Sequence, residues 1–523
     1  MENNESKVVN KSNNKFVIII LILSIIIIAL ATLLILNITK KVDKDNGVVN
    51  SAEKNNVTST YRMTSNSLEN FDLSFLKLEN NQSNMIYSPI SIKYALEMLA
   101  DGSNGTTKQQ ISALIGDYKA NKYSNSSNLS FANALFAKDT YRNSIKKEYN
   151  SMLTTKYNAE IIYDPFTSPN NINSWVNEKT LGLINNAVDN NSLKNDFILF
   201  NALAINMNWK YKLQAAATAS KIPDMIYYVE YLHENYSTEI TPLSEESYHS
   251  LNFNNSKQVK SVEIGASINN YDIVNTLGRD NIKKTITEEY KAFLAENNRE
   301  ETEEEINNNV EKFIDELDSN YKNIKISTDF ELYTDDNVKV FAKDLKEYDG
   351  KNLQYIGIMP KEEELSSYIK NSTSANINNL INNLKEIKLE NFESGKVTKI
   401  TGYIPLFKFD YELKLTDDLK KLGVTDVFDE SKADLSNITS DTNAYISETS
   451  HKSTIEFSNE GIRAAATTEG GGWGNLRSGF EHLYEVPVEV IDITFDKPYM
   501  FLIRDKSTGE IWFAGTVYEP INK

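Results

Sequence analysis

Helical periodicity dominates the first half of this sequence, whereas strand-like segments dominate its last third. The spacing of apolar residues predicts amphipathic helices over Ser67–Leu78, Ser88–Met98 and Asn170–Val188. Strand-like runs rich in β-branched and aromatic residues are Phe197–Trp209, Val397–Ile404, His451–Phe457, Val486–Phe495, Tyr499–Arg504 and Ile511–Val517. Helices that precede interleaved strands predict an α+β fold, in which the two kinds of element form separate layers.

One segment departs from this order. Residues 285–323 are acidic and helical in pattern, and their apolar residues recur on one face: Ile306, Val310, Phe313, Ile314 and Leu317. We predict a solvated helical insert whose apolar face packs on the body of the domain. A partner-binding appendage is the alternative.

The N-terminus carries a long apolar run. From Phe16 to Leu36 only Ser24 and Thr32 are polar, and lysines flank the run on both sides. A membrane-spanning helix takes roughly 20 such residues, whereas the apolar part of a cleaved signal peptide has about 7–15. We therefore predict a tail over 1–15, an uncleaved transmembrane helix over 16–38 and a flexible polar stalk over 39–66.

Several classes of chemistry lack the residues they need. The chain has no cysteine, which excludes disulfides and zinc–thiolate sites, and it has no Gly-x-Ser-x-Gly or His-Glu-x-x-His motif. The glycines at 470–472 and 474 lack the Gly-Lys-Ser/Thr ending of a phosphate-binding loop. A formal charge of -18 disfavours contact with nucleic-acid phosphates. We predict no enzyme, no metal site and no cofactor.

A series of motifs occurs in the order typical of one family. They are NMIYSPISI (84–92), FANALF (131–136), INSWVNEKT (172–180), FNALAINMNW (200–209), LKKLGVTDVF (419–428), HKSTI (451–455), EGIRAAAT (460–467), KPYMFLI (497–503) and FAGTV (513–517). On these motifs the chain resembles the serpins over residues 67–520, apart from the acidic insert. Within that family it resembles a serine-protease inhibitor of the bacterial type. The resemblance implies three β-sheets, about eight or nine helices and an exposed reactive-centre loop.

Five residues of the matched motifs have assigned places in that family. Four fall on the shutter, a polar cluster that holds the middle strands of the main sheet together: Ser88, Ser91, Asn201 and His451. Trp209 matches the tryptophan of the breach, where the loop begins to enter the sheet. Taken singly, a serine before a proline is an ordinary helix cap and a tryptophan an ordinary core residue. The assignments therefore depend on the matched order.

The resemblance also implies a mechanism. In the family a protease attacks the loop, and the acyl-enzyme is trapped when the cut loop inserts as a new strand into the main sheet of a metastable fold. The expected hinge consists of Glu460, Gly461, Ile462, Arg463, Ala464, Ala465, Ala466, Thr467 and Thr468. Strand alternation places Ile462, Ala464, Ala466 and Thr468 on one face, which is small or apolar enough for burial.

The loop departs from the family pattern. The hinge and reactive-centre loop, expected over 459–487, are longer than usual; Ile462 stands where Thr, Ser or Val is preferred, and Asn459 where a glutamate is usual. Counting therefore does not fix the scissile bond. We place it at Arg477–Ser478, which suits a trypsin-like protease; the rival positions are Asn475, Leu476, Phe480 and Tyr484.

The function expected from these residues is irreversible inhibition of a protease by a suicide substrate. The partner is a serine protease, with a cysteine protease as a second class, held in a covalent acyl complex. The alternative is a non-inhibitory serpin that acts as a cell-surface binding or structural protein. Lysine counts on the two sides of 16–38 do not set the orientation. From the function we expect a monomer in the cell membrane, single-pass, with its large domain outside the cell and no nucleic-acid partner.

Overall fold

The computed structural model describes residues 69–211, 213, 248–326, 329–447, 449, 451–459, 461–462 and 484–521, without the side chains of 318–326 and 461–462. The predicted tail, transmembrane helix and stalk lie outside these residues. Within the described ranges, no helix combines the length and the apolar character that crossing a bilayer requires.

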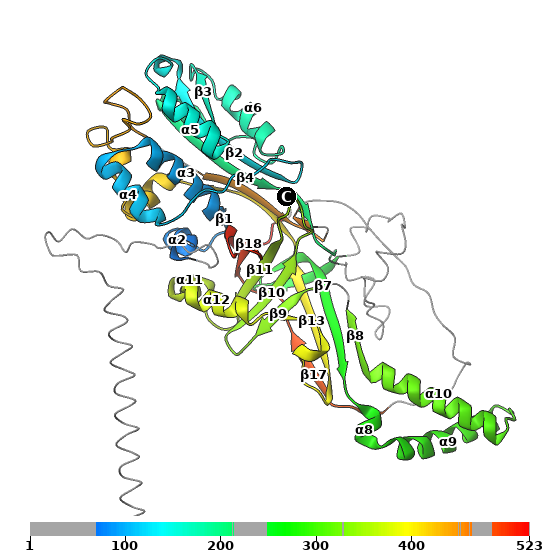
Figure 1. The fold of residues 1–523 in the computed structure, drawn as a ribbon. Helices are drawn as coiled ribbons and strands as arrows, with labels where there is room; N and C mark the ends of the chain where they lie inside the picture. The colour runs from blue at the N-terminus through cyan, green and yellow to red at the C-terminus, as the bar shows by residue number, and fades with distance from the viewer. Residues whose placement is uncertain are drawn as a thin grey trace, which may run out of the picture. The chain divides into compact units, whose positions relative to one another are not determined.

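Three helices of the first half form where the apolar spacing predicts them: α2 (Asn70–Leu78), α3 (Pro89–Gly102) and α6 (Asn170–Lys179) (Figure 1). Two more, α4 (Gly105–Ile115) and α5 (Lys147–Tyr157), were not predicted. α3 starts behind Ser88, whose side chain accepts the backbone N–H of Ser91 at 3.2 Å, with Pro89 at the first helical position. α6 ends at Lys179 rather than at the predicted Val188, because Leu181 and Gly182 take positive φ angles of 58° and 74°.

Seven strands form one continuous antiparallel sheet. In spatial order they are β1 (Met85–Tyr87), β19 (Ile511–Val517), β18 (Tyr499–Asp505), β11 (Leu353–Pro360), β10 (Val338–Asp344), β9 (Glu331–Thr334) and β12 (Lys385–Glu386). The strands at its centre are buried along almost their whole length. Gly515 allows the close approach of β1, since a Cβ there would lie 2.2 Å from the carbonyl oxygen of Met85.

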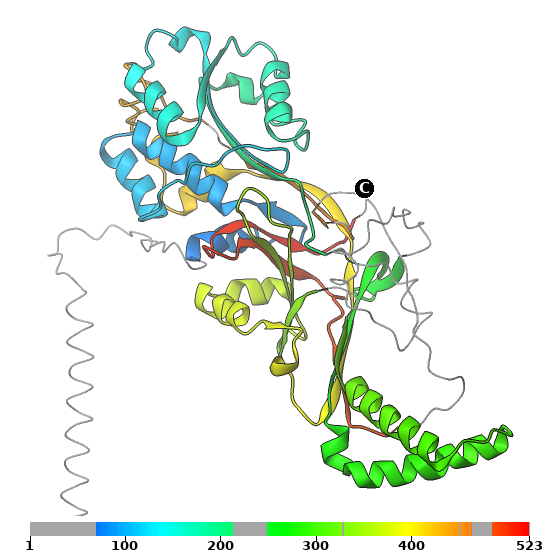
Figure 2. The same cartoon turned by 45° about the vertical axis from the view of Figure 1, so that its right-hand side comes forward.

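A second sheet has a parallel edge strand. Its strands are β17 (Val488–Asp492), β13 (Lys396–Pro405), β7 (Lys257–Asn270) and β6 (His249–Phe253), and β8 (Lys322–Ile326) also pairs with β7. β17 runs parallel to β13 and has no other neighbour among the described strands. In Figure 2 a pair of green helices follows the ends of the green and yellow strands of this sheet.

The remaining strands correct the expectation of three sheets. β3 (Glu160–Asp164), β2 (Leu129–Lys138) and β4 (Phe197–Ile205) form one set, β14 (Phe407–Leu413) and β15 (His451–Phe457) a second, and β5 (Met207–Asn208) and β16 (Gly461–Ile462) a third. The described residues thus hold five hydrogen-bonded sets. The number exceeds three for two reasons: β4 and β15, although neighbours, share no ladder, and β5, which follows β4 after Asn206, pairs separately with β16.

The acidic insert is a helical hairpin. It consists of α8 (Ile273–Leu277), α9 (Arg279–Glu296) and α10 (Glu303–Tyr321), so it begins before the predicted Thr285. Its helices bury an apolar set, called here the hairpin cluster, that includes Ile282, Ile286, Ile306, Val310, Ile314 and Leu317. The predicted apolar face of α10 therefore packs mainly on the other helices of the insert, and this cluster is separate from the main core.

Three further helices complete the described α-structure: α11 (Leu365–Asn371), α12 (Ser374–Asn382) and α13 (Leu415–Lys421). Short 3₁₀ turns cover Asp139–Tyr141, Ser192–Lys194, Leu389–Asn391 and Asp426–Phe428. The described ranges contain eleven α-helices, and eight lie outside the insert of α8, α9 and α10. That number agrees with the eight or nine helices that the motifs imply in addition to the insert.

Candidate functional site: a gap between two strands

Strands β4 and β15 lie side by side, but within the described ranges no backbone ladder joins them. β4 pairs with β2 and β15 pairs with β14, in both cases antiparallel. Both strands run toward Trp209, because β4 leads into it and its indole N–H donates to the carbonyl of Ser458, just after β15. Each strand therefore turns an edge toward the other, and such an edge is a template for another strand.

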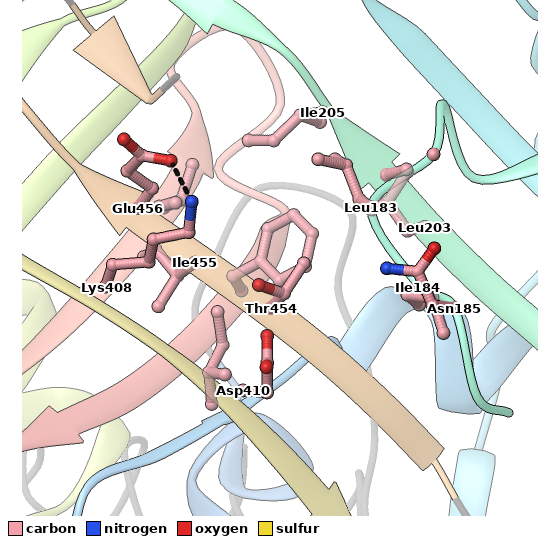
Figure 3. A pocket seen from close by; sticks show the side chains of 15 residues that line it. Leu183, Ile184, Asn185, Leu203, Ile205, Lys408, Asp410, Thr454, Ile455 and Glu456 are labelled. Atoms are coloured by element: carbon pink, nitrogen blue, oxygen red, sulfur yellow. Dashed lines mark ion pairs between the residues drawn. The ribbon is translucent and has the colours of Figure 1, made fainter. Parts of the chain in front are cut away.

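A cavity of about 200 Å³ marks this gap. Figure 3 shows Leu203 and Ile205 at the cavity on the β4 side, and Lys408 and Glu456 on the side of the β14–β15 pair. Lys408 and Glu456 form an ion pair at 2.9 Å. The lining is thus apolar where it meets the core and charged at its other border, which is the environment of a strand with one buried face.

The four predicted shutter residues come together beside the gap. The backbone N–H of Ser88 donates to Nε2 of His451 at 3.0 Å, and the hydroxyl of Ser91 donates to the side-chain oxygen of Asn201. All four residues are buried. Because Asn201 belongs to β4 and His451 to β15, the backbone N–H of Ser88 and the hydroxyl of Ser91 at the start of α3 connect the two strands across the missing ladder.

Two polar partners in this network were missed by sequence reasoning. Asn133 of β2 is the register partner of Asn201 and accepts a hydrogen bond from its side chain. The hydroxyl of Ser453 lies 2.9 Å from Nε2 of His451. Their signals were available, because Asn133 interrupts an apolar strand and Ser453 shares a strand face with His451.

Burial lowers the pKa of His451 to about 4, so its imidazole is neutral near pH 7. The backbone N–H of Ser88 can only donate, and therefore Nε2 accepts and the ring proton sits on Nδ1. The Ser453 hydroxyl then also donates to Nε2. Protonation of His451 would place a second donor against Ser88 and break the link between α3 and β15.

Trp209 is buried where the two strands end. Its ring makes edge contacts with Tyr355 and Phe457, at centroid distances of 6.1 and 5.2 Å. The ammonium of Lys343 lies 6.0 Å from the same ring and pairs with Asp329 at 2.9 Å. Burial lowers the pKa of Lys343, which the carboxylate of Asp329 opposes. The tryptophan is thus fixed at the mouth of the gap by contacts with β11, β15 and β10.

The start of the hinge lies at this mouth. Gly461 and Ile462 form β16, which pairs antiparallel with β5: Gly461 is opposite Asn208 and Ile462 opposite Met207. The carbonyl of Asn459 accepts the backbone N–H of Leu213 at 2.8 Å. The chain therefore leaves β15, turns back and begins a strand of opposite direction beside the extension of β4.

The other loop predictions fall mainly outside the described residues. Outside them lie Glu460, Arg463, Ala464, Ala465, Ala466, Thr467, Thr468, Asn475, Leu476, Arg477, Ser478 and Phe480. Tyr484 is described, and its half-buried side chain packs against the hairpin cluster. Among the described residues, no group of three or more His, Cys, Asp or Glu side chains could hold a metal ion.

Comparisons with known proteins agree with this geometry. The sequence model of a family described as "Serpin (serine protease inhibitor)" matches residues 67–222 and 230–520. An uncharacterized serpin-like protein of Methanosarcina acetivorans is 23% identical over 482 residues, which cover 87% of this chain and 86% of that protein. The leukocyte elastase inhibitor of Xenopus tropicalis is 25% identical over 475 residues, covering 86% and 97%. These relatives do not single out a bacterial type.

Solved structures share the fold. The native state of tengpin, a thermophilic serpin, is similar with a TM-score of 0.54 and 20% identity, over 90% of this chain and 96% of that one. Thyroxine-binding globulin in complex with thyroxine is similar with a TM-score of 0.54 and 17% identity, over 86% and 97%. At these identities the likeness shows the fold alone.

Proposed function

Because this chain belongs to the serpin family, we propose that it inhibits a serine protease as a suicide substrate. The observation that carries the proposal is the antiparallel pairing of β16 with β5 at the mouth of the gap between β4 and β15. A protease would cleave the loop and become acylated. The freed loop would then continue β16 as a strand between β4 and β15, and the attached protease would be displaced before it could hydrolyse the acyl bond.

The β16–β5 register supports the predicted burial pattern of the hinge. If the register continues past Asn206, three pairs follow: Ala464 with Ile205, Ala466 with Leu203, and Thr468 with Asn201. Directly opposite residues share one face of a sheet, and Leu203 and Ile205 belong to the main core. The even-numbered hinge residues would therefore turn toward the core, where an alanine fits and a charged side chain does not.

The length of β4 limits where the scissile bond can lie. In the same register Phe197, the first residue of β4, would be opposite Gly472. The inserted strand thus accounts for the chain as far as Gly472, and the bond should lie beyond it. Arg477–Ser478 meets this condition, as do Asn475, Leu476 and Phe480. Tyr484 is the weakest candidate, because a side chain packed on the hairpin cluster is poorly placed for a protease pocket.

A panel of proteases tests the proposal. Trypsin-, chymotrypsin- and subtilisin-like serine proteases and a papain-like cysteine protease are each incubated with the full chain. We expect at least one SDS-stable complex of the summed mass, and mass spectrometry of the released peptide should place the cut between Gly472 and Tyr484. Cleavage in that interval by every protease, without any complex, would refute suicide inhibition.

The non-inhibitory alternative is favoured by one observation. Ile462 stands at the first step of insertion, where smaller or hydroxylated residues are usual in the family, and it already pairs with Met207. A bulkier residue than the usual Thr, Ser or Val there would hold the hinge in place instead of letting it advance. A cell-surface binding or structural protein would then show a cleavable loop but no complex, and replacing Ile462 by threonine would not produce one.

We also propose that residues 16–38 anchor the protein in a membrane, with the serpin domain outside the cell. The support is the length of the apolar run from Phe16 to Leu36. A protease added to intact cells should remove the domain and leave the anchor in the membrane fraction. A soluble protein whose N-terminus follows Leu36 would show cleavage of a signal peptide instead.

A further inference from the structure

The C-terminal end of the reactive-centre loop packs against the helical insert. Tyr484 and Val486 are half-buried, and their side chains pack against the hairpin cluster of α8, α9 and α10. The carbonyl of Pro487 then accepts the backbone N–H of Val397 at 2.8 Å, where β17 begins. The insert therefore holds the C-terminal end of the loop, immediately before it joins the second sheet.

β17 is an edge strand held mainly by its backbone ladder. Its only neighbour in the described part of the chain is β13, and Val488 and Val490 are 52% and 65% exposed. Its ion pairs, Lys396–Glu489 at 2.8 Å and Lys339–Asp492 at 2.5 Å, involve partly exposed groups and add little. Between Tyr484 and Val490, apolar burial thus comes largely from the two residues on the hairpin cluster, and Ile491 is the first residue of β17 that packs on the main core.

Insertion of an uncut loop would pull on this end. The nine residues of β4 span about 30 Å. An uncut chain inserted as far as Gly472 must return to Tyr484 through residues 473–483, which reach at most roughly 40 Å when fully extended. Most of that reach is used in running back along β4. About 10 Å of reach is then left for the way from the mouth of the gap back to Tyr484, so full insertion of an uncut loop would pull on Tyr484 and Val486.

We infer that the helical hairpin positions the C-terminal end of the loop and so couples insertion to cleavage. An intact loop is restrained at Tyr484 and Val486, whereas a cut loop is free at its new end and inserts without disturbing them. The inference rests on the proposed insertion of the loop between β4 and β15. It gives the insert a role as a kinetic restraint on the metastable state.

The test compares two valines of one segment. Val486→Asp places a carboxylate against the hairpin cluster, and Val490→Asp is the matched control on the exposed face of β17. Full-chain variants are incubated uncut at 37 °C, and their intact mass, thermal midpoint and remaining inhibition are followed with time. We expect V486D to convert to a more stable, inactive, uncut form about tenfold faster than the parent, and V490D to convert at the parent rate.

Further variants keep the outcome decisive. Val486→Ala should accelerate the conversion less, and Val486→Ile should match the parent, which separates restraint by packing from a general folding defect. Equal rates for the parent, V486D and V490D would overturn the restraint, even if cutting the loop still raises the thermal midpoint. If cutting the loop raises the midpoint of none of them, the proposed insertion fails, and the restraint fails with it.

Discussion

The seven-stranded sheet and the layer of β4 and β15 differ in how they use their edges. In the seven-stranded sheet every strand pairs with its spatial neighbours, from β1 at one edge to β12 at the other, and the ladder is continuous through the buried centre. In the other layer, β4 is buried along almost its whole length and β15 at alternate residues, and the two strands stop short of each other around a cavity. In the seven-stranded sheet neighbouring strands are joined by ladders, whereas β4 and β15 are separated by the cavity, and β16 pairs with β5 at its mouth. Under the proposed mechanism this gap receives the cut loop.

This comparison implies that the two layers respond differently to a cut in the loop. Filling the gap should add a ladder on both sides of a new strand and bury its even-numbered side chains. The seven-stranded sheet has no such reserve. Each prediction below either removes that difference or measures it.

The largest effect is expected from cutting the loop between Gly470 and Val486. The thermal midpoint should rise by roughly 10–20 °C, since each kcal/mol is worth about 2 °C in a domain of this size. Calorimetry of the intact and nicked forms, with the cut verified by mass, provides the measurement. An unchanged or lower midpoint would argue for the non-inhibitory alternative.

A charge on the buried face of the hinge should prevent insertion of the cut loop, and the gap between β4 and β15 would then stay unfilled. Ala464→Arg would bring an unpaired charge toward Ile205, a burial opposed by several kcal/mol. The loop should still be cut at the same bond, but the protease should escape, so that at least tenfold more inhibitor is consumed per enzyme trapped. Titration of the target protease measures this ratio. Ala465→Arg, on the opposite face, is the matched control and should be far milder; equal trapping by both variants would contradict insertion in this register.

A change inside the continuous sheet should act alike on both forms. Gly515→Ala puts a Cβ 2.2 Å from the backbone oxygen of Met85, which cannot move without shifting β1. We expect a loss of about 2–4 kcal/mol in the intact and in the nicked protein. Gly357→Ala is the control, because its Cβ would meet the ring of Phe495 at 2.9 Å, and a ring can tilt. Urea unfolding compares the intact and nicked forms of the parent and of both variants, and a loss restricted to the intact form would contradict the separation of the two layers.

The last effect, similar in size to that of Gly515→Ala, concerns pH. The pKa of His451 is about 4 in the folded protein, below its ordinary value of 6.5, so the unfolded chain binds the proton more readily. Stability contributed by the neutral ring is complete above pH 6.5 and is lost as the pH falls from 6.5 to about 4, by roughly 3 kcal/mol. The slope of urea stability over this interval should flatten in His451→Gln. A parent slope retained by H451Q would assign it to other groups; His249→Gln is the comparison variant, at a less buried histidine.

The sequence by itself determined the fold class and most of the strands that frame the gap. Predicted segments such as His451–Phe457 and Ile511–Val517 coincide with β15 and β19, because long runs of β-branched and aromatic residues leave little choice of structure. The shutter residues were named on motif order alone, and the fold links them by hydrogen bonds that use the backbone N–H groups of Ser88 and Ser91 as well as side chains. The C-terminal end of α6 could not be predicted from the spacing of apolar residues, because it depends on the backbone angles of Leu181 and Gly182.

Only the tertiary structure decided which edges meet and which do not. Whether β4 and β15 pair is a matter of two strands more than 240 residues apart, and no local pattern in either one specifies it. The apolar face of α10 was visible in the sequence, but its partner was not, because an amphipathic helix fits any apolar surface of the right width. The contact of Val486 with that hairpin could not be predicted from the sequence either. The insert and the end of the loop are adjacent only because β7, β13 and β17 lie in one sheet.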